Sequence, residues 1–359
     1  MTSLHEIAPD DVVETHEDAR GNDREPLLVV EPLLAFLDQH GLGSGDIDVR
    51  PVGEGHSNVT YAVTRGDAEF VLRRPPRGPL PPSAHDVLRE ARVIGAVHGR
   101  APVPEVLAVC ADEAVIGAPF FVMELVEGDA ITSQVPAALD SEQERRRIGE
   151  ELVDGLVAVH AVPWEACGLE GFGKPTGYLE RQVRRFLGLW DHNKTREIPA
   201  VESVAEWLKA NLPESPAATI VHGDYRLGNT LMSGPPARLT AILDWEMSTI
   251  GDPLADVGYL CTLWVEADDP PLGMFELTGV TRQPGFPSRA ELVARYEERS
   301  GRSMTDIRWY QTLALWKSIV FMEGNYKRAV SGSTDDPFLK SFGEGVVELA
   351  ERAEELTRG

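Results

Sequence analysis

The polar stretch "VHGDYRLGNTLM", residues 221–232, constrains the fold more than any other part of the chain. A turn, "SGPPAR", and a second strand-like run, "LTAILD", follow it. Two short apolar runs around a Gly-Pro turn predict an antiparallel hairpin. Because the arms of a hairpin return to the same end, Asn229 and Asp244 should be neighbours. Asp224 lies on the loop that leads into this end.

These three side chains have the chemistry of a metal-dependent site. An amide oxygen beside a carboxylate suits Mg²⁺, which typically takes one or two protein carboxylates together with substrate phosphates and water. A further carboxylate at Asp224 could accept a proton from an attacking hydroxyl. Asp and Asn also begin many ordinary turns. On the hairpin alone, a site and a plain turn both remain open.

The sequence pattern changes near residue 127, from one typical of strands to one typical of long helices. Before it, "NVTYAVT" and "EFVLRR" predict a hairpin, "SAHDVLREARVIGAVHG" a helix and "PFFVMELVEGD" a buried strand. After it the patterns are those of long helices, the first with a capping box at Ser141 and Glu144. We therefore predict a small strand-rich lobe at 28–126 and a larger, mainly helical lobe at 127–359. The acidic, weakly apolar residues 1–27 predict a disordered tail.

Composition excludes several classes of protein. The net charge of −24 argues against a nucleic-acid partner, because phosphate backbones are bound by concentrated Lys and Arg. No run reaches the roughly 18 apolar residues of a membrane span, and the N-terminus lacks signal-peptide features. We expect a cytoplasmic protein with no membrane partner. The separated Cys110, Cys167 and Cys261 favour neither a disulfide framework nor a zinc site. The oligomeric state stays open.

"HGDYRLGN", followed after a hairpin by "ILDWE", resembles the catalytic segment of the aminoglycoside phosphotransferase and choline kinase families. These are relatives of the protein kinases, whose loop reads H-R-D-x-K-x-x-N. "GDPLADVGYL" completes the signature, and the resemblance covers roughly residues 45 to 345. It implies an α+β, bilobal protein-kinase-like fold with a small antiparallel-sheet N-lobe and a larger helical C-lobe. It also implies an ATP- and Mg²⁺-dependent phosphotransferase.

The resemblance gives each residue of the opening stretch a role. It makes Asp224 the catalytic base and places Arg226 where the kinase lysine meets the transferring phosphate. Asn229 and Asp244 become the metal ligands, with Glu246 assisting at the metal. Three further residues are expected to be structural: His222 braces the loop, Asp256 holds it by hydrogen bonds, and Asp252 caps a helix.

The first lobe then becomes the nucleotide-binding part. "VGEGHSNVTY" matches the phosphate-covering loop, whose binding residues would be Gly53, Gly55, Ser57 and Asn58. Arg73 occupies the strand position of the ATP lysine, and Glu90 that of its helical ion-pair partner. An inward Glu is costly without a cation. "FVMELVEG" would be the hinge, with Glu124 and Val126 offering backbone groups to adenine. Arg in place of Lys departs from the family pattern, because a guanidinium clamps phosphate with a different reach.

The sequence constrains the molecule that accepts the phosphoryl group less than it constrains the catalytic residues. "VLRRPPRGPLPPSAHDVLREARVI" and "GAPFFVMELVEG" resemble the branch that includes the kinase domain fused to certain acyl-CoA dehydrogenases, which implies a hydroxyacyl-CoA acceptor. A basic cluster suits the phosphates of coenzyme A, although a solvated helix face is equally compatible with it. Its members are Arg181, Arg184, Arg185, Lys194 and Arg196. Lys317 and Glu323, on a later helix, could face the same cleft.

Three hypotheses therefore remain for the function. The first is an ATP-dependent O-phosphotransferase acting on a small hydroxylated metabolite. The second is an aminoglycoside or amino-alcohol kinase, which the global negative charge would favour and the local basic cluster disfavours. The third is a nucleotide-binding pseudokinase that acts as a sensor or scaffold. Arg73 favours the third, whereas the retention of Asp224, Asn229 and Asp244 speaks against it.

Overall fold

The structure is a computed structural model, and it describes residues 9–52, 58–78, 85–270, 276–333 and 337–358. The chain divides into two compact units. The N-terminal unit comprises residues 1–99 and 103–127, and the C-terminal unit comprises residues 100–102 and 128–359. The boundary that we predicted between residues 126 and 127 lies one residue from this division.

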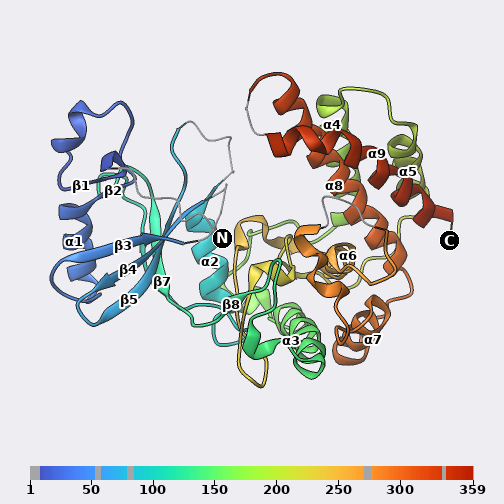
Figure 1. Cartoon of the computed structure of the whole chain (residues 1–359), viewed down its shortest axis with the longest axis horizontal. Coiled ribbons are helices and arrows are strands. Elements are labelled where there is room, and N and C mark those ends of the chain that lie inside the picture. Colours follow the sequence, from blue (N-terminus) through green and yellow to red (C-terminus); the bar gives the residue numbers. More distant parts are fainter. Residues whose placement is uncertain (1–8, 53–57, 79–84, 271–275, 334–336, 359) are drawn as a thin grey trace. The chain divides into compact units, whose positions relative to one another are not determined.

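An antiparallel sheet forms the centre of the N-terminal unit (Figure 1). Within the described residues its strand order is β3-β4-β5-β7-β6. The bounds are Ile47–Pro51 (β3), Val59–Arg65 (β4), Ala68–Arg74 (β5), Val106–Cys110 (β6) and Phe120–Glu124 (β7). The expected hairpin is β4 and β5, paired without interruption from Val59 and Arg74 to Arg65 and Ala68. Gly66 makes its turn with a φ of +58°, a conformation that favours glycine.

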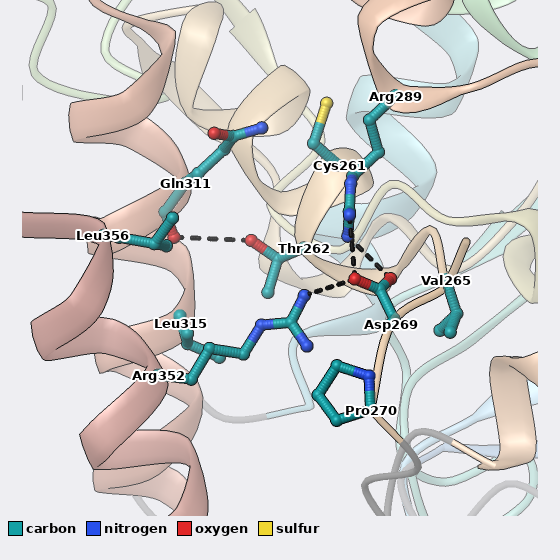
Figure 2. A pocket seen from close by; sticks show the side chains of 10 residues that line it. All are labelled: Cys261, Thr262, Val265, Asp269, Pro270, Arg289, Gln311, Leu315, Arg352 and Leu356. Atoms are coloured by element: carbon teal, nitrogen blue, oxygen red, sulfur yellow. Dashed lines mark hydrogen bonds and ion pairs between the residues drawn. The ribbon is translucent and has the colours of Figure 1, made fainter. Parts of the chain in front are cut away.

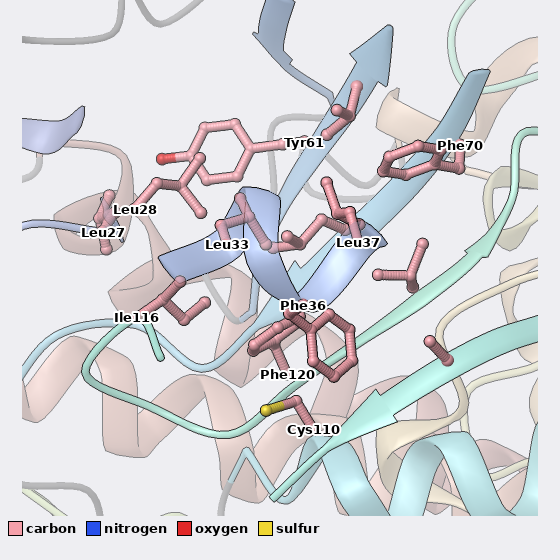
Figure 3. Packing of buried hydrophobic residues seen from close by; sticks show 14 residues of the cluster. Leu27, Leu28, Leu33, Phe36, Leu37, Tyr61, Phe70, Cys110, Ile116 and Phe120 are labelled. Atoms are coloured by element: carbon pink, nitrogen blue, oxygen red, sulfur yellow. The ribbon is translucent and has the colours of Figure 1, made fainter. Parts of the chain in front are cut away.

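Two helices cover this sheet. The α1 helix, Val30–Gln39, buries Leu33, Phe36 and Leu37 against an apolar cluster from β4, β5 and β7 (Figure 3). The α2 helix, Val87–Val97, contacts β6 and β7. One face of this helix is buried and includes an acidic residue among apolar ones; the residues are Val87, Glu90, Ala91, Ile94 and Val97. The buried carboxylate thus belongs to the helix face that packs on the sheet.

The predicted disordered tail needs correction within the described residues. Val12–Val13 (β1) pairs in parallel with Leu28–Val29 (β2). The Leu27 N–H donates to the Asp11 carbonyl at 2.7 Å, and the Arg77 guanidinium forms an ion pair with the Asp11 carboxylate. Composition indicates disorder in this segment because it contains little apolar material, but backbone pairing and an ion pair to a distant arginine hold it in place.

Helices dominate the C-terminal unit (Figure 1). The bounds are Glu142–His160 (α3), Tyr178–Asn193 (α4), Pro199–Ala210 (α5), Leu254–Leu263 (α6), Arg289–Ser300 (α7), Ile307–Val330 (α8) and Pro337–Arg358 (α9). The α8 helix contacts α4, α5, α6 and α9, which explains why apolar residues occur all around it. At the start of α3, Ser141 accepts from the Glu144 N–H as predicted, while the Glu144 carboxylate accepts from the Ala237 N–H.

Two small sheets complete the described part of this unit. Asp129–Ala130 (β8), Thr230–Ser233 (β10) and Arg238–Ile242 (β11) form one, and Thr219–Val221 (β9) and Thr249–Gly251 (β12) form the other. Across both units, the short 3-10 helices of the described residues are Pro9–Asp11, Asp18–Gly21, Ala137–Leu139, Trp164–Cys167, Leu227–Asn229, Trp245–Met247 and Glu276–Arg282. None of the described helices is long and apolar enough to cross a membrane.

Candidate active site

The predicted hairpin is present and brings its two ends together. Strands β10 and β11 pair in antiparallel register, with Thr230 opposite Ile242. Just outside the strands, the Leu243 N–H donates to the Asn229 carbonyl at 2.9 Å. Asn229 and Asp244 therefore leave the hairpin at the same end, as the sequence predicts.

Asp224 lies at the centre of the polar contacts on the loop before this hairpin. The Asn229 side-chain amide donates to Asp224 Oδ2 at 2.6 Å and to the Asp224 carbonyl at 2.9 Å. Arg226 Nε lies 3.7 Å from the same carboxylate oxygen. The Tyr259 hydroxyl donates to Asp224 Oδ1 at 2.6 Å. Three of the residues that the sequence singled out are thus in direct contact.

Asp244 has an unusual backbone. Its φ of 65° and ψ of 63° lie in the left-handed region, which costs a residue with a side chain about 1 kcal/mol or more. Such strain persists where the surroundings hold it, and it often marks a functional position. The strained residue directly precedes the short helix Trp245–Met247, which contains the half-buried Glu246.

Asp256 holds the loop of residues 222–229 by accepting hydrogen bonds from the backbone of the loop. Its two carboxylate oxygens accept from the His222 N–H at 2.7 Å and the Gly223 N–H at 2.8 Å. His160 Nε2 lies 3.2 Å from Asp256 Oδ2. Burial would raise the pKa of Asp256, but these bonds and the neighbouring histidines outweigh burial and lower it. The structural role predicted for Asp256 is confirmed.

The two histidines of this network have assignable tautomers. His222 Nδ1 accepts from the Asp224 N–H at 3.2 Å, so its Nε2 is the donor to the Leu243 carbonyl at 3.0 Å. His222 therefore braces the loop against the hairpin, as expected. Burial lowers the pKa of His160, partly offset by Asp256. A neutral His160 donates from Nε2 to Asp256 and accepts at Nδ1 from the Tyr296 hydroxyl at 2.7 Å.

Sequence reasoning missed Tyr259 and His160. Tyr259 follows Asp256 by three residues on α6, a spacing that places two side chains on one helix face, so this signal was available. Burial first, and then the Asp224 carboxylate, raise the pKa of Tyr259, which keeps its hydroxyl a donor. His160 ends α3, far from the motif in sequence, and no local pattern marks it. Asp252 was predicted to cap a helix, but the N-cap of α6 is Pro253; Asp252 lies one position earlier and accepts from the Leu254 N–H at 2.9 Å and from the Tyr310 hydroxyl at 2.8 Å.

In the N-terminal unit, Arg73 and Glu90 form the expected ion pair. Arg73 Nε lies 2.9 Å from Glu90 Oε2, and Glu90 is 2% exposed. The Asn58 amide donates to the same oxygen at 3.3 Å, and Arg73 Nη1 donates to Thr60 Oγ1 at 3.1 Å. The strand arginine is thereby oriented by one buried carboxylate and one hydroxyl.

The remaining predicted nucleotide contacts are only partly described. Gly53, Gly55 and Ser57 lie outside the described residues. The Glu124 N–H donates to the Glu105 carbonyl at 2.9 Å, so this backbone donor serves the sheet. Val126 follows β7 and is half-buried.

Several residues of the predicted basic cluster bind partners within the protein. Lys194 pairs with Glu197 and Glu202 at 3.2 and 3.7 Å, and Arg196 lies 3.5 Å from the Glu323 carboxylate. Arg181 donates to the carbonyls of Thr176 and Lys174. Arg184 and Arg185 are exposed on α4. The spacing of Arg181, Arg184 and Arg185 places these three on one side of α4, whereas Lys194 and Arg196 lie in the loop after the helix and pair with glutamates.

Glu323 serves the packing of helices. It is fully buried and accepts from the Thr195 N–H at 2.9 Å and from Thr195 Oγ1 at 2.6 Å. The idea that it faces an acceptor cleft is therefore corrected, since its carboxylate is used to hold the loop after α4.

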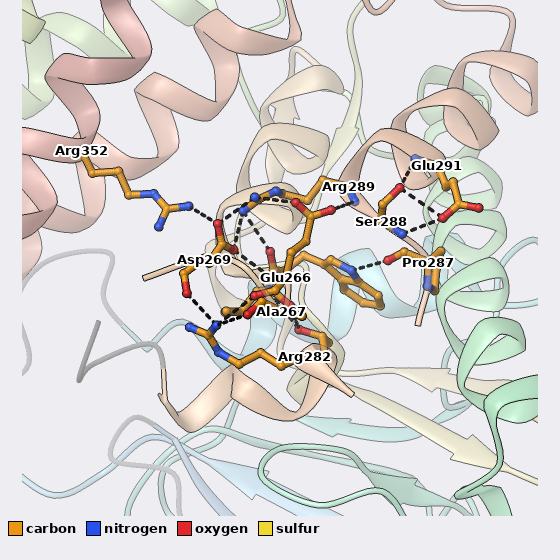
Figure 4. A network of polar contacts seen from close by, with 12 residues as sticks. Glu266, Ala267, Asp269, Arg282, Pro287, Ser288, Arg289, Glu291 and Arg352 are labelled. Carbon is orange, nitrogen blue, oxygen red and sulfur yellow. Dashed lines mark hydrogen bonds and ion pairs between the residues drawn. The ribbon is translucent and has the colours of Figure 1, made fainter. Parts of the chain in front are cut away.

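A separate cavity of about 160 Å³ lies among α6, α7, α8 and α9 (Figure 2). At its wall, Asp269 accepts from Arg289 at 2.8 Å and from Arg352 at 2.9 Å. Glu266 pairs with Arg289 at 2.6 Å, and Arg282 donates to nearby carbonyls (Figure 4). The named side chains of this network carry three positive and two negative charges, and the described lining includes none of residues 222–229.

The donor set near the hairpin fits a hard cation that shares its ligands with a substrate. Among the described residues, no group of three or more His, Cys, Asp or Glu side chains could hold a metal ion. An amide oxygen at Asn229 and a carboxylate at Asp244 match Mg²⁺, which often takes few protein ligands and completes its shell with phosphates and water.

The comparisons with known proteins decide the family. The profile described as "Phosphotransferase enzyme family" matches residues 48–299. The chain belongs to this family. Its α+β protein-kinase-like fold is confirmed by the solved structures that it resembles. Membership supports a kinase-type enzyme that acts on a small molecule.

Several curated relatives carry this domain as part of a longer chain. The chain is 34% identical over 326 residues to mouse acyl-CoA dehydrogenase family member 10, covering 89% of this chain and 30% of the relative. It is 33% identical over 337 residues to human acyl-CoA dehydrogenase family member 11, covering 91% of this chain and 43% of the relative. The chain thus spans less than half the length of these relatives.

Solved structures show the same fold. A candidate aminoglycoside phosphotransferase from Ralstonia eutropha JMP134 is 32% identical with a TM-score of 0.78, over 91% of this chain and 98% of that one. A thermostable mutant of the aminoglycoside phosphotransferase APH(4)-Ia, in a ternary complex with AMP-PNP and hygromycin B, is 16% identical with a TM-score of 0.59. It covers 91% of this chain and 98% of that one, and supports the fold alone.

Proposed function

We propose that the chain transfers the γ-phosphoryl group of ATP to a hydroxyl group of a small metabolite, with a hydroxyacyl-CoA as the preferred acceptor class. The observation that carries the proposal is the contact set of Asp224 with Asn229, Arg226 and Tyr259 at the open end of the β10–β11 hairpin. The similarity to the acyl-CoA dehydrogenase family members supports the acceptor class.

The residues divide the work by their chemistry. The acceptor oxygen attacks the γ-phosphorus, the bond from that phosphorus to the β–γ bridging oxygen breaks, and ADP leaves. Asp224 orients the acceptor hydroxyl and takes its proton late in the transfer. The Arg226 guanidinium offsets charge on the phosphoryl oxygens. Asn229 and Asp244 would hold Mg²⁺, which neutralises the phosphates when bound.

In the N-terminal unit, Arg73 is proposed to bind ATP phosphates with its guanidinium oriented by Glu90. Asn58 contributes to the same cluster through Glu90. Arg can clamp phosphate with two parallel hydrogen bonds, a geometry that Lys lacks. The proposal assigns Gly53, Gly55, Ser57, Glu124 and Val126 to the nucleotide as well.

The test is a mass-spectrometric screen. Wild-type protein with ATP and Mg²⁺ is incubated with hydroxyacyl-CoAs, aminoglycosides and amino alcohols. We expect a mass gain of one phosphate on a hydroxyacyl-CoA, abolished in Asp224→Asn. A mass gain of one phosphate on an aminoglycoside or amino alcohol alone would show that the acceptor belongs to that class and not to the hydroxyacyl-CoAs. ATP binding without transfer to any compound would indicate a pseudokinase and contradict the proposal.

A further inference from the structure

Lys317 occupies an unusual place in the C-terminal unit. It lies on α8 where this helix packs against α4, and its ammonium sits 4.9 Å from the centre of the Phe186 ring. Phe186 also contacts Trp316 and Phe321 of α8, with ring centres 6.4 and 5.1 Å away. The lysine is therefore half-buried at an aromatic helix interface rather than extended into solvent.

The charge of Lys317 is not matched by a carboxylate. In the part of the chain that the structure describes, it forms no ion pair, whereas Lys194 and Lys209 each pair with a glutamate. The chain holds 58 acidic against 34 basic residues, so acidic partners are abundant. Desolvating an ammonium without a partner is costly, and one ring face offsets only part of that cost.

Lys317 lies on α8, which packs on α6, the helix whose Tyr259 donates to Asp224. Burial lowers the pKa of Lys317 to about 8; Asp256 and Asp224 oppose this shift, and the Arg185 guanidinium adds to it. Arg185 precedes Phe186 on α4, is exposed, and makes no ion pair within the described residues. Arg185 thus adjoins the aromatic ring that the Lys317 ammonium covers, and the two cations lie on helices that pack together.

We propose that Lys317 and Arg185 form a subsite for an acidic group, a carboxylate or a phosphate, on the molecule that accepts the phosphoryl group. This inference rests on the proposed function for the identity of that molecule. A bound anion would supply the charge that the two cations lack, and it would leave the rest of the acceptor beside Asp224. The subsite makes the enzyme selective for acidic hydroxyl compounds over polycationic ones.

Binding is tested without ATP, so the result is independent of turnover. Calorimetric titrations use two matched pairs: hydroxybutyrate with its methyl ester, and hydroxybutyryl-CoA with hydroxybutyryl-pantetheine, which lacks the phosphates. We expect the anionic member of at least one pair to bind wild-type protein about tenfold more tightly. The pair that shows the preference identifies the group as a carboxylate or a phosphate.

The variants locate the preference. Lys317→Met keeps the length and apolar stem of the side chain, and Arg185→Gln changes an exposed position that leaves the fold intact. Each should reduce the preference to about twofold or less. The control is Arg328→Gln, at an exposed position about 16 Å further along α8. It removes one positive charge and should leave the preference for the anionic ligand unchanged. Equal binding within both pairs by wild-type protein, or a preference that survives both variants, overturns the proposal.

Two further readouts separate a binding role from a structural one. In the absence of ligand, Lys317→Met should unfold at the same temperature as wild-type protein or higher, because it removes an unmatched charge; a clear decrease would show a structural lysine. With an acceptor found by the mass screen, Lys317→Met should raise KM and leave kcat nearly unchanged. Anion preference without any transfer would uphold the subsite and refute the proposed function, whereas transfer without preference would refute the subsite alone.

Discussion

Two buried carboxylates, Glu90 in the N-terminal unit and Asp256 in the C-terminal unit, hold functional groups in different ways. Glu90 acts on a side chain, since its oxygen orients the Arg73 guanidinium on β5. Asp256 acts on a backbone, since it accepts hydrogen bonds from two successive N–H groups, those of His222 and Gly223, in the loop before β10. A rigid strand already fixes the backbone of Arg73, whereas the loop before β10 has no ladder of its own. The comparison predicts that loss of Glu90 affects ligand binding and loss of Asp256 affects the loop and its stability.

The largest effect is expected for substitution of Asp224, which lies on the loop before β10. Asp224→Asn should lower kcat about 10³-fold, because the amide cannot take the proton of the acceptor. Nucleotide affinity should stay within a factor of about two. Steady-state kinetics and equilibrium titration with ATP measure the two quantities. A variant that transfers at the wild-type rate would remove Asp224 from the mechanism.

Asp256→Asn should destabilise the C-terminal unit by about 3 kcal/mol, because an amide nitrogen would face backbone donors in a buried site. Urea unfolding measures this change. The matched control is Asp191→Asn, an exposed position on α4, which should stay within about 0.5 kcal/mol of wild type. Equal stability of the two variants would show that the loop does not depend on Asp256.

The same network predicts a pH dependence. Because the pKa of His160 is lowered in the folded state, the unfolded chain binds a proton more readily below the ordinary value of 6.5. The stabilisation is therefore present above that pH and is lost as the pH falls below it, by up to about 1.4 kcal/mol per pH unit. Unfolding measured from about pH 7 to 5 should show a shallower loss in His160→Gln. Parallel curves for the two proteins would mean that His160 carries no part of this dependence.

The smallest effect concerns Tyr259. Its hydroxyl donates to Asp224 Oδ1 at 2.6 Å and helps to hold this carboxylate in place, so Tyr259→Phe should lower kcat about fivefold, because such a hydrogen bond contributes about 1 kcal/mol. Steady-state kinetics measure this change. An unchanged kcat would indicate that the tyrosine only fills space beside the loop.

The sequence was informative where a motif and local geometry agreed. Register and turn chemistry predicted the hairpin that joins Asn229 to Asp244, and the family resemblance predicted the ion pair of Arg73 with Glu90. It was misleading where partners are distant in sequence. Arg196 looked like part of a phosphate site because its carboxylate partner, Glu323, comes from α8, and Arg77 anchors a tail that composition marks as disordered. His160 joins the loop network from 96 residues away.

The most direct test measures nucleotide affinity and turnover on Glu90→Gln and Asp224→Asn together, in the same buffer and with an acceptor found by the mass screen. The account predicts a split. Glu90→Gln should weaken ATP binding about tenfold with a smaller change in kcat, and Asp224→Asn should bind ATP normally with kcat reduced about 10³-fold. Variants that lose the same parameter by similar factors would contradict the division of work between the two carboxylates.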